Sequence, residues 1–442
     1  MNPLFSNYLN SNQKDYSKSF IHKFINTKKF SNNIGIRNNN KPNKKPTIKK
    51  IKKYFTNNFI NFMKAYIIMI LIQTILSNIN LERKLESKSS YILLKFIGLG
   101  PTNFLSSSYN GISPDYIYIN DTLVEILTTK IINITSINDI IKLEWINNIN
   151  SCQKMFYQIK NISEVDLSYF NSSLVTDTSY MFGSCSGITS INLNNFKTSS
   201  VTNMAGMFSF CKGLLSIDFS YFNTSSVLKM NEFIRGCSKL TSINVTNFDT
   251  SKVNDMGTMF RENEELLFLD LSNFNTSNVV NMYGMFSFDG KLTSLILSNF
   301  DTKKVTNFGF FLEGCKKLTI IDISSFDTSS VQSFAGMFTG CSGLIELDIS
   351  HFNTKKAKDF GRFFDGCTKI TSLNVSNFDT SNAGAMSEMF KNCQSLTDLD
   401  ITNFNTSNVK VMNGLFLNCY KLTSINLSKF DTSKVTNMKS MF

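Results

Sequence analysis

Few side chains in this 442-residue chain are of the types that carry chemistry, and one of those types is regularly spaced. There are two histidines, His22 and His351, and neither belongs to a serine–histidine–aspartate set, a glycine-rich phosphate loop or a metal-ligand cluster. We therefore expect no enzyme: no catalytic residue, no metal site and no cofactor. Eight of the nine cysteines fall in register with one 26-residue period: Cys185, Cys211, Cys237, Cys315, Cys341, Cys367, Cys393 and Cys419.

The cysteine row is interrupted twice, by Asn263 and Asp289, and Cys152 lies out of register. The uninterrupted runs hold three and five thiols, so neighbour-to-neighbour disulfides could not use every one. This favours buried free thiols that act as small apolar side chains. Some stacked pairs could still form disulfides, since adjacent coils lie at a suitable distance. The absence of any C-x-x-C spacing argues against a zinc site.

The cysteines follow a period that runs through most of the chain without insertion or deletion. Twelve hydrophobic pairs share the same 26-residue period, from Met155-Phe156 to Met441-Phe442. A fixed period of this length is typical of a solenoid, because one coil cannot bury its own apolar face and must stack on its neighbours. The chain ends in the middle of a coil, so we expect the natural protein to continue beyond Phe442.

Each coil predicts a strand, a corner and a short helix. In residues 237–262, Leu240, Ile243 and Val245 have the spacing of a short strand. Asp249 could cap a helix, and apolar residues from Val253 to Phe260 have helical spacing. The predicted fold class is an α/β repeat solenoid: a right-handed, leucine-rich-repeat-like coil with a parallel sheet on one face and short helices on the other. The phenylalanine that follows each strand predicts a buried aromatic ladder.

The open face of the predicted sheet is mostly polar, as at Ser242 and Asn244, and an Asp/Asn row including Asp270 and Asp322 runs along it. An aspartate row could bind Ca²⁺, but the neutral neighbours favour a structural role. Three apolar residues in consecutive coils break this polar face and mark a candidate partner-binding patch. The candidate partner-binding residues are Phe268, Ile296, Ile320, Ser242, Asn244, Asp270 and Asp322.

The sequence before the repeats divides into three parts. Residues 1–58 are rich in Asn and Lys and predict a disordered basic tail; residues 1–62 hold 13 of the 45 Lys and Arg and one acid, Asp15. Residues 59–79 contain a short apolar core and predict a signal peptide or a signal anchor. If translation starts at Met63, the segment is an ordinary secretory signal and the tail is not translated. A buried helix is the remaining alternative.

Residues 88–150 predict a β-rich cap for the first coil, with Trp145 in its core, and residues 151–442 form the tandem repeats. The remainder of the chain after residue 62 has 32 basic and 32 acidic residues (45 − 13 and 33 − 1), so nucleic-acid binding by the repeats is not expected. Asn-x-Ser/Thr sequences occur only after residue 119, and we single out four near the cap as candidate glycosylation sites: Asn120, Asn133, Asn161 and Asn171.

The motif L-T-S-[IL]-[ND]-[LIV]-S-N-F-[DN]-T-S-x-V-x-x-M-x-x-M-F-x-x-C is plainest in residues 396–419 and 422–442. It resembles the BspA-like leucine-rich-repeat surface protein family, whose 26-residue units are also described as a mycoplasma-lipoprotein-type repeat of unknown function. The resemblance covers residues 150–442. It implies a leucine-rich-repeat-like solenoid on a cell surface that adheres to host or matrix proteins, and it provides no catalytic residues to carry over.

These observations predict a surface-displayed or secreted binding scaffold that acts in adhesion or protein–protein interaction. Its partner would be a protein or glycan on another cell, a host or a matrix, and the chain would remain membrane-anchored if residues 59–79 are retained. The alternative is an intracellular interaction scaffold in which residues 59–79 are not inserted into a membrane.

Overall fold

The computed structural model describes residues 67–71, 74, 90–124 and 129–442. The chain divides into two units, residues 1–82 and 83–442. In the first unit residues 67–71 are helical. No helix within the described residues is long and apolar enough to cross a membrane. The predicted tail, residues 1–58, and most of the predicted signal or anchor segment lie outside the described residues.

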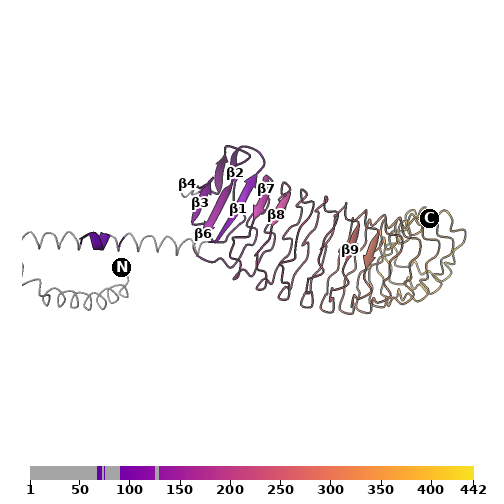
Figure 1. Ribbon diagram of the computed structural model, residues 1–442. Helices are drawn as coiled ribbons and strands as arrows, with labels where there is room; N and C mark the ends of the chain where they lie inside the picture. Colours follow the sequence, from indigo (N-terminus) through magenta and orange to yellow (C-terminus); the bar gives the residue numbers. More distant parts are fainter. Residues whose placement is uncertain (1–66, 72–73, 75–89, 125–128) are drawn as a thin grey trace, which may run out of the picture. The chain divides into compact units, whose positions relative to one another are not determined.

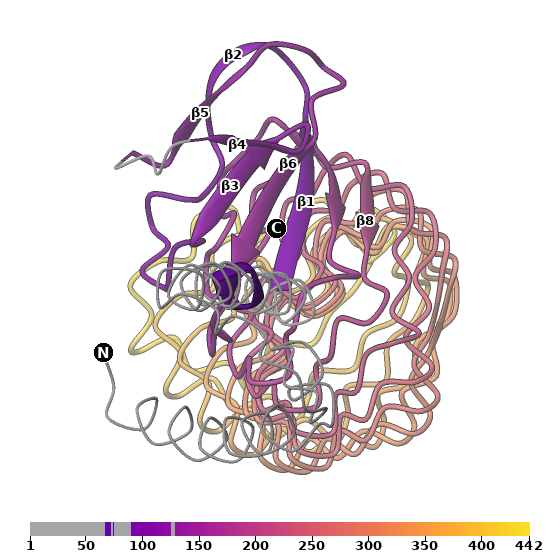
Figure 2. The ribbon, with the colours of Figure 1, turned by 60° about the vertical axis from the view of Figure 1, so that its left-hand side comes forward.

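The second unit contains a stack of 26-residue coils. Isolated parallel bridges join equivalent residues of successive coils, from Ser151 with Asp177 to Val411 with Asn437. Figure 1 shows the successive turns of chain side by side, and Figure 2 looks obliquely along them. The period read from the sequence is therefore the length of one turn of chain.

The predicted strand positions form regular strands in only some coils. β7 (Ile162–Asp166) pairs in parallel with β8 (Ser190–Asn192), and β9 (Phe268–Asp270) pairs in parallel with β10 (Ser294–Ile296). Elsewhere the segments still connect through main-chain hydrogen bonds, such as Ile345 N–H to Thr319 O at 3.1 Å. The alternation predicted for this side of the coil is confirmed, since Leu240, Ile243 and Val245 are all buried.

The predicted short helices are wrong. In residues 129–442, all of which the structure describes, the chain forms turns where helices were expected. Alternate N–H groups bond to the next coil instead of to their own: Met256 to Asn281 O at 3.1 Å, and Phe260 to Met285 O at 3.0 Å. Asp249 caps no helix; its carboxylate accepts a hydrogen bond from Ser251 N–H at 2.9 Å. The repeats are thus mostly β, and residues 129–442 contain no helix.

A left-handed backbone at two positions of every coil explains why helices do not form. One row of residues with positive φ begins at Lys154 (56°) and recurs at Tyr180, Gly206 and onward; a second begins at Gln158 (64°) and recurs at Ser184 and onward. Left-handed residues cannot continue a right-handed helix. Eight of these positions are glycines: Gly206, Gly236, Gly284, Gly314, Gly336, Gly340, Gly366 and Gly414.

The interior of the stack is filled by the predicted rows. The Met-Phe pairs and the phenylalanine ladder are buried through most of the stack, and many consecutive ladder rings lie nearly parallel. Phe378 and Phe404, for example, have ring centroids 6.5 Å apart and an interplanar angle of 1°. This contact pattern supports the prediction that the ladder is core and not a ligand groove.

The segment before the repeats is β-rich and adds strands to the side of the repeat sheet. β1 (Ser90–Phe96), β3 (Tyr116–Ile119), β4 (Thr122–Val124) and β6 (Ile141–Trp145) join β7 and β8 in the order β4-β3-β6-β1-β7-β8. β2 (Gly100–Asn103) and β5 (Ile131–Ile134) form a separate antiparallel pair.

β1 runs antiparallel to β7, so the sheet edge of the first coil is paired and hidden from other chains. Trp145 is fully buried, as expected, and its ring contacts Phe170 of the first ladder position edge-on at 5.6 Å. Its indole N–H donates to Ile112 O at 2.9 Å.

Aromatic side chains at the turns are accommodated by glycines one coil further on. A Cβ atom built on Gly206 would lie 2.3 Å from the ring of Tyr180, and one on Gly336 would lie 2.6 Å from the ring of Phe310. Six rings follow this rule, each over the glycine at the same position of the next coil: Tyr157–Gly183, Tyr180–Gly206, Phe210–Gly236, Tyr283–Gly309, Phe288–Gly314 and Phe310–Gly336. Side-chain size is therefore coupled between neighbouring coils.

Gly336→Ala should destabilise the stack by about 1–2 kcal/mol, because Gly336 has φ of +62° and its Cβ would collide with Phe310. Urea unfolding measures the change. Gly384→Ala is the matched control, since its Cβ would be in ordinary contact, 3.8 Å from Lys358 O, and its φ is not positive. Equal losses of stability in the two variants would contradict this account of the turns.

Candidate binding surface

The three apolar residues predicted to break the polar face are all exposed and lie in consecutive coils. Phe268 in β9, Ile296 in β10 and Ile320 in the following coil have 48%, 38% and 66% of their surface exposed. In the parallel register Phe268 lies beside Ser294 and Ile296 lies beside Asp270. The structure thus places the predicted residues on one side of neighbouring strand segments.

Two further residues that the sequence analysis missed extend this patch. Leu267 and Ile345 are 51% and 50% exposed; Leu267 belongs to the coil of Phe268, and Ile345 to the coil after that of Ile320. Most coils carry threonine at their position, as at Thr241 and Thr293. The replacement of this threonine by Leu267 and Ile345 was the sequence signal that could have placed both residues in the patch. We define the apolar patch as Leu267, Phe268, Ile296, Ile320 and Ile345.

The remaining predicted partner-binding residues surround or precede the patch. Ser242, Asn244 and Asp322 are exposed, and Asp270 is half-buried. Each Asp or Asn of this row accepts a hydrogen bond from the N–H two residues later, as in Ser324 N–H to Asp322 Oδ1 at 3.0 Å and Thr246 N–H to Asn244 Oδ1 at 3.1 Å. Asp and Asn are therefore structurally equivalent here and differ mainly in charge.

The sheet face is acidic. The outward strand positions begin at Glu164, Asp166 and Ser168, recur in every coil to Ser428, and hold no Lys, Arg or His. They hold nine acids: Glu164, Asp166, Asp218, Asp270, Asp322, Glu346, Asp348, Asp398 and Asp400. Within residues 90–124 and 129–442, only Glu164 among these forms an ion pair, with Lys95 at 2.8 Å. Hydrogen bonds from Ser272 lower the pKa of Asp270, and those from Ser324 lower the pKa of Asp322.

The cysteines of the repeat row are free thiols, in agreement with the favoured interpretation. Each donates its thiol to the carbonyl of the Met-Phe pair in the preceding coil, as in Cys341 Sγ to Leu312 O at 3.1 Å and Cys185 Sγ to Phe156 O at 2.9 Å. Burial raises the pKa of Cys341 to about 12. The buried thiols of this row therefore fill space between coils and are poor nucleophiles, whereas Cys419 is half-buried.

Asn263 and Asp289 replace two of these thiols and are completely buried. They form a polar chain across three coils: Asn263 Oδ1 accepts from Cys237 N–H at 3.0 Å, and Asp289 Oδ1 accepts from Asn263 N–H at 2.8 Å. The other carboxylate oxygen of Asp289, Oδ2, is buried without a hydrogen-bond partner. Desolvation raises the pKa of Asp289 well above its usual value.

Asp289→Asn should therefore stabilise the protein at neutral pH by about 1–3 kcal/mol, because it replaces a buried ionisable group with a neutral one of the same shape. Because the pKa of Asp289 is raised in the folded state, its destabilising effect is absent below its unfolded pKa and grows as pH rises above that value. Urea unfolding of both proteins at pH 7 and near pH 3 measures this. The gain should shrink at the lower pH; a gain that is equal at both would show that ionisation of Asp289 is not its source.

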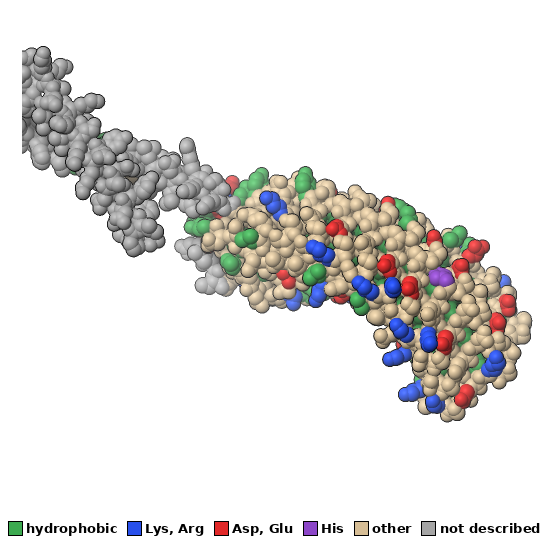
Figure 3. All heavy atoms as spheres, turned by 90° about the horizontal axis from the view of Figure 1, so that it is seen from below, with side chains coloured by type: hydrophobic (Ala, Val, Ile, Leu, Met, Phe, Trp, Pro, Cys, Tyr) green, Lys and Arg blue, Asp and Glu red, His purple; other side chains and the backbone are tan. Residues whose placement is uncertain are grey.

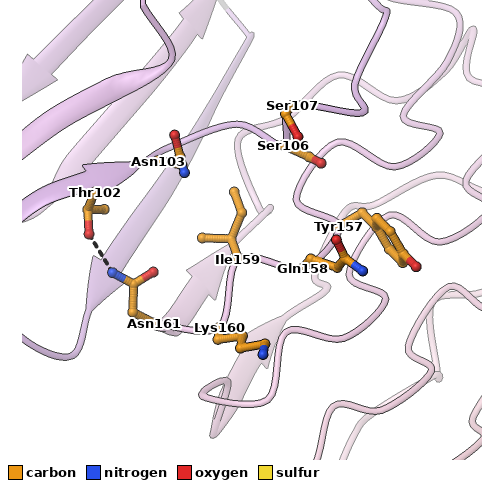
Figure 4. A pocket seen from close by; sticks show the side chains of 9 residues that line it. All are labelled: Thr102, Asn103, Ser106, Ser107, Tyr157, Gln158, Ile159, Lys160 and Asn161. Carbon is orange, nitrogen blue, oxygen red and sulfur yellow. Dashed lines mark hydrogen bonds between the residues drawn. The ribbon is translucent and has the colours of Figure 1, made fainter.

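A polar pocket of about 340 Å³ lies between the segment that begins in β2 and the first coil. Figure 4 shows Thr102 and Asn103 facing Gln158 and Asn161 across it. The amide of Asn161 donates to Thr102 Oγ1, so the side chain of this predicted glycosylation site forms a hydrogen bond within the protein. The residues that line the pocket do not indicate a particular kind of ligand.

The other three predicted glycosylation sites are exposed. The amide of Asn120 donates to Asp139 Oδ1 and that of Asn171 donates to Asn148 Oδ1, both at 2.9 Å, whereas Asn133 lies in β5 with its side chain outward. Among the described residues no group of three or more His, Cys, Asp or Glu could hold a metal ion. His351, on the face shown in Figure 3, contacts Ile323 O through its Nε2 at 3.1 Å.

The geometry defines a mostly β repeat protein whose distinctive surface is an acidic strand face with an apolar patch. A family model described as "Mycoplasma protein of unknown function, DUF285" matches residues 127–242, 210–296, 228–342, 289–373 and 362–442. These overlapping matches cover residues 127–442, well over half of the chain, and the chain belongs to this family. No curated protein and no solved structure matches the chain.

Proposed function

We propose that the chain is a binding scaffold, displayed on a cell surface or secreted, that acts in adhesion or protein–protein interaction. In this proposal the coils form a right-handed, leucine-rich-repeat-like solenoid of the BspA-like type. The parallel bridges between equivalent residues and the inward strand rows support that architecture. The apolar patch on the strand face is the observation that carries the function.

The patch is unusual because the stack has no structural need for it. Ser, Asp, Asn or Thr fill the equivalent positions in most coils, and those coils stack in the same 26-residue register. Exposed apolar residues that cluster on neighbouring strands offer a partner a site from which water can be excluded. Leu267 extends this site in the coil before that of Ile296, and Ile345 extends it into the second coil after that of Ile296.

Phe268→Ala combined with Ile296→Ser should weaken binding to the natural partner by at least about tenfold, because both side chains would be buried at the centre of the interface. The partner is captured from the surroundings of the native cells, and its affinity is measured by biolayer interferometry. The matched control is Leu228→Ala with Val280→Ser, two residues with 42% and 43% exposure outside the strand face. If the control weakens binding as much as the patch variant, the patch is not the site.

Surface display is a separate part of the proposal, which residues 59–79 support through their signal-like composition. Protease treatment of intact cells, followed by mass spectrometry, should release peptides from residues 150–442 before lysis. Peptides from residues 1–62 would show that translation starts at Met1. Repeat peptides that appear only after lysis would favour the alternative, an intracellular interaction scaffold.

A further inference from the structure

We infer that the partner of the strand face is a basic protein surface or segment, with apolar side chains at its centre and Lys or Arg around them. This inference rests on the proposed function, because it specifies the partner of the same site. Two independent features of the face lead to it: the arrangement of charge around the apolar patch, and the chemistry that holds this charge in place.

The charge of the face is not a reflection of the whole protein. Residues 63–442 carry equal numbers of basic and acidic residues, yet all the charged residues at the outward strand positions are acidic. The acids also border the patch directly. Asp270 pairs with Ile296 across β9 and β10, Asp322 lies two residues after Ile320, and Glu346 follows Ile345.

These carboxylates are available to a partner. Asp322, Glu346 and Asp348 are exposed, and none of the three forms an ion pair in the part of the chain that the structure describes. The Oδ1 atoms of Asp322 and Asp348 accept hydrogen bonds from Ser324 and Ser350, which fix the carboxylates on the surface. Fixed charges lose little freedom when a partner binds, and complementary charge raises the rate and specificity of association.

A partner made only of apolar residues would leave the bordering carboxylates partly desolvated and unpaired, which is unfavourable. An acidic partner would be repelled. A simple polycation would neutralise the face but leave Phe268 and Ile320 exposed. Only a partner with both features, an apolar centre and a basic border, satisfies the whole surface.

The test uses the full chain and two synthetic amphipathic peptides of equal length and leucine content. One peptide carries lysine at its polar positions and the other carries glutamate. Fluorescence anisotropy should show binding of the lysine peptide, weakened by added salt, and much weaker binding of the glutamate peptide. Failure of the lysine peptide to bind, or equal binding of both peptides, would overturn the inference.

The charge variant is Asp270→Asn, Asp322→Asn and Asp348→Asn together. Its fold should be unaffected, because Asn244 makes the same hydrogen bond in its own coil. We expect roughly tenfold weaker binding of the lysine peptide and less salt dependence. The matched control is Asp301→Asn, Asp327→Asn and Asp379→Asn. These residues belong to the corner row, the Asp and Asn residues that follow the ladder phenylalanine of most coils and include Asp249. The control removes three charges while retaining the main-chain hydrogen bonds of this row.

The two proposals fail in different ways. Suppose that the charge variant binds the natural partner as tightly as the wild type does, while Phe268→Ala with Ile296→Ser binds it more weakly. The patch then remains a binding site, but its partner is not basic. If the control variant in the corner row loses as much affinity for the lysine peptide as the charge variant does, the electrostatic attraction is nonspecific and the inference fails. If the patch variant binds both the peptide and the natural partner normally, the proposed function itself fails.

Discussion

The main-chain hydrogen bonds between turns of neighbouring coils are the constraint on which the rest of the structure depends. At these turns alternate N–H groups donate to a carbonyl of the next coil, as in Glu388 N–H to Asn413 O at 2.8 Å. This geometry requires a left-handed residue at two positions in every coil. It holds each coil in register with the next, and an insertion within one coil would shift every later row of core side chains.

Because equivalent residues stack directly, a side chain is constrained mainly by its counterpart in the adjacent coil. The rings of Tyr180 and Phe310 lie where a Cβ on the next coil would collide, and glycine occupies that position in both cases. The cysteine row follows the same logic, since each thiol fits between coils and bonds to a carbonyl of the preceding one. Neighbouring coils therefore differ in a coupled way, and a coil cannot be exchanged for another without regard to its position.

The sequence predicted what depends on side-chain burial. The period, the inward strand rows, the phenylalanine ladder and the core position of Trp145 follow from where apolar residues recur, and the exposure of Phe268, Ile296 and Ile320 follows from their place at outward positions of the same pattern. The prediction from sequence failed where the main-chain conformation, and not side-chain burial, determines the structure. The spacing from Val253 to Phe260 fits a helix and also fits consecutive turns that point the same side chains inward. Glycines at the left-handed positions, such as Gly236 and Gly284, were the signal against a helix, but Glu, Thr and Phe occupy the same positions in other coils and obscured it.

The pairing of β1 with β7 could not be read from the sequence either, because an antiparallel strand beside the first coil and a cap over its end need the same apolar residues.

The two coils that begin at Asn263 and Asp289 depart from the repeat pattern both in the core and on the surface. Their buried row is polar where the others have cysteine, and each has one apolar residue on the strand face, Phe268 or Ile296, at a position where most coils have Ser, Asp or Asn. They also supply β9 and β10, a regular parallel strand pair in the middle of the stack. The core change leaves Asp289 Oδ2 buried without a hydrogen-bond partner, so better packing does not explain it. The buried Asn263 and Asp289, the exposed Phe268 and Ile296 and the β9–β10 pair thus occur together in the same two coils, which are the coils at the centre of the binding site that we propose.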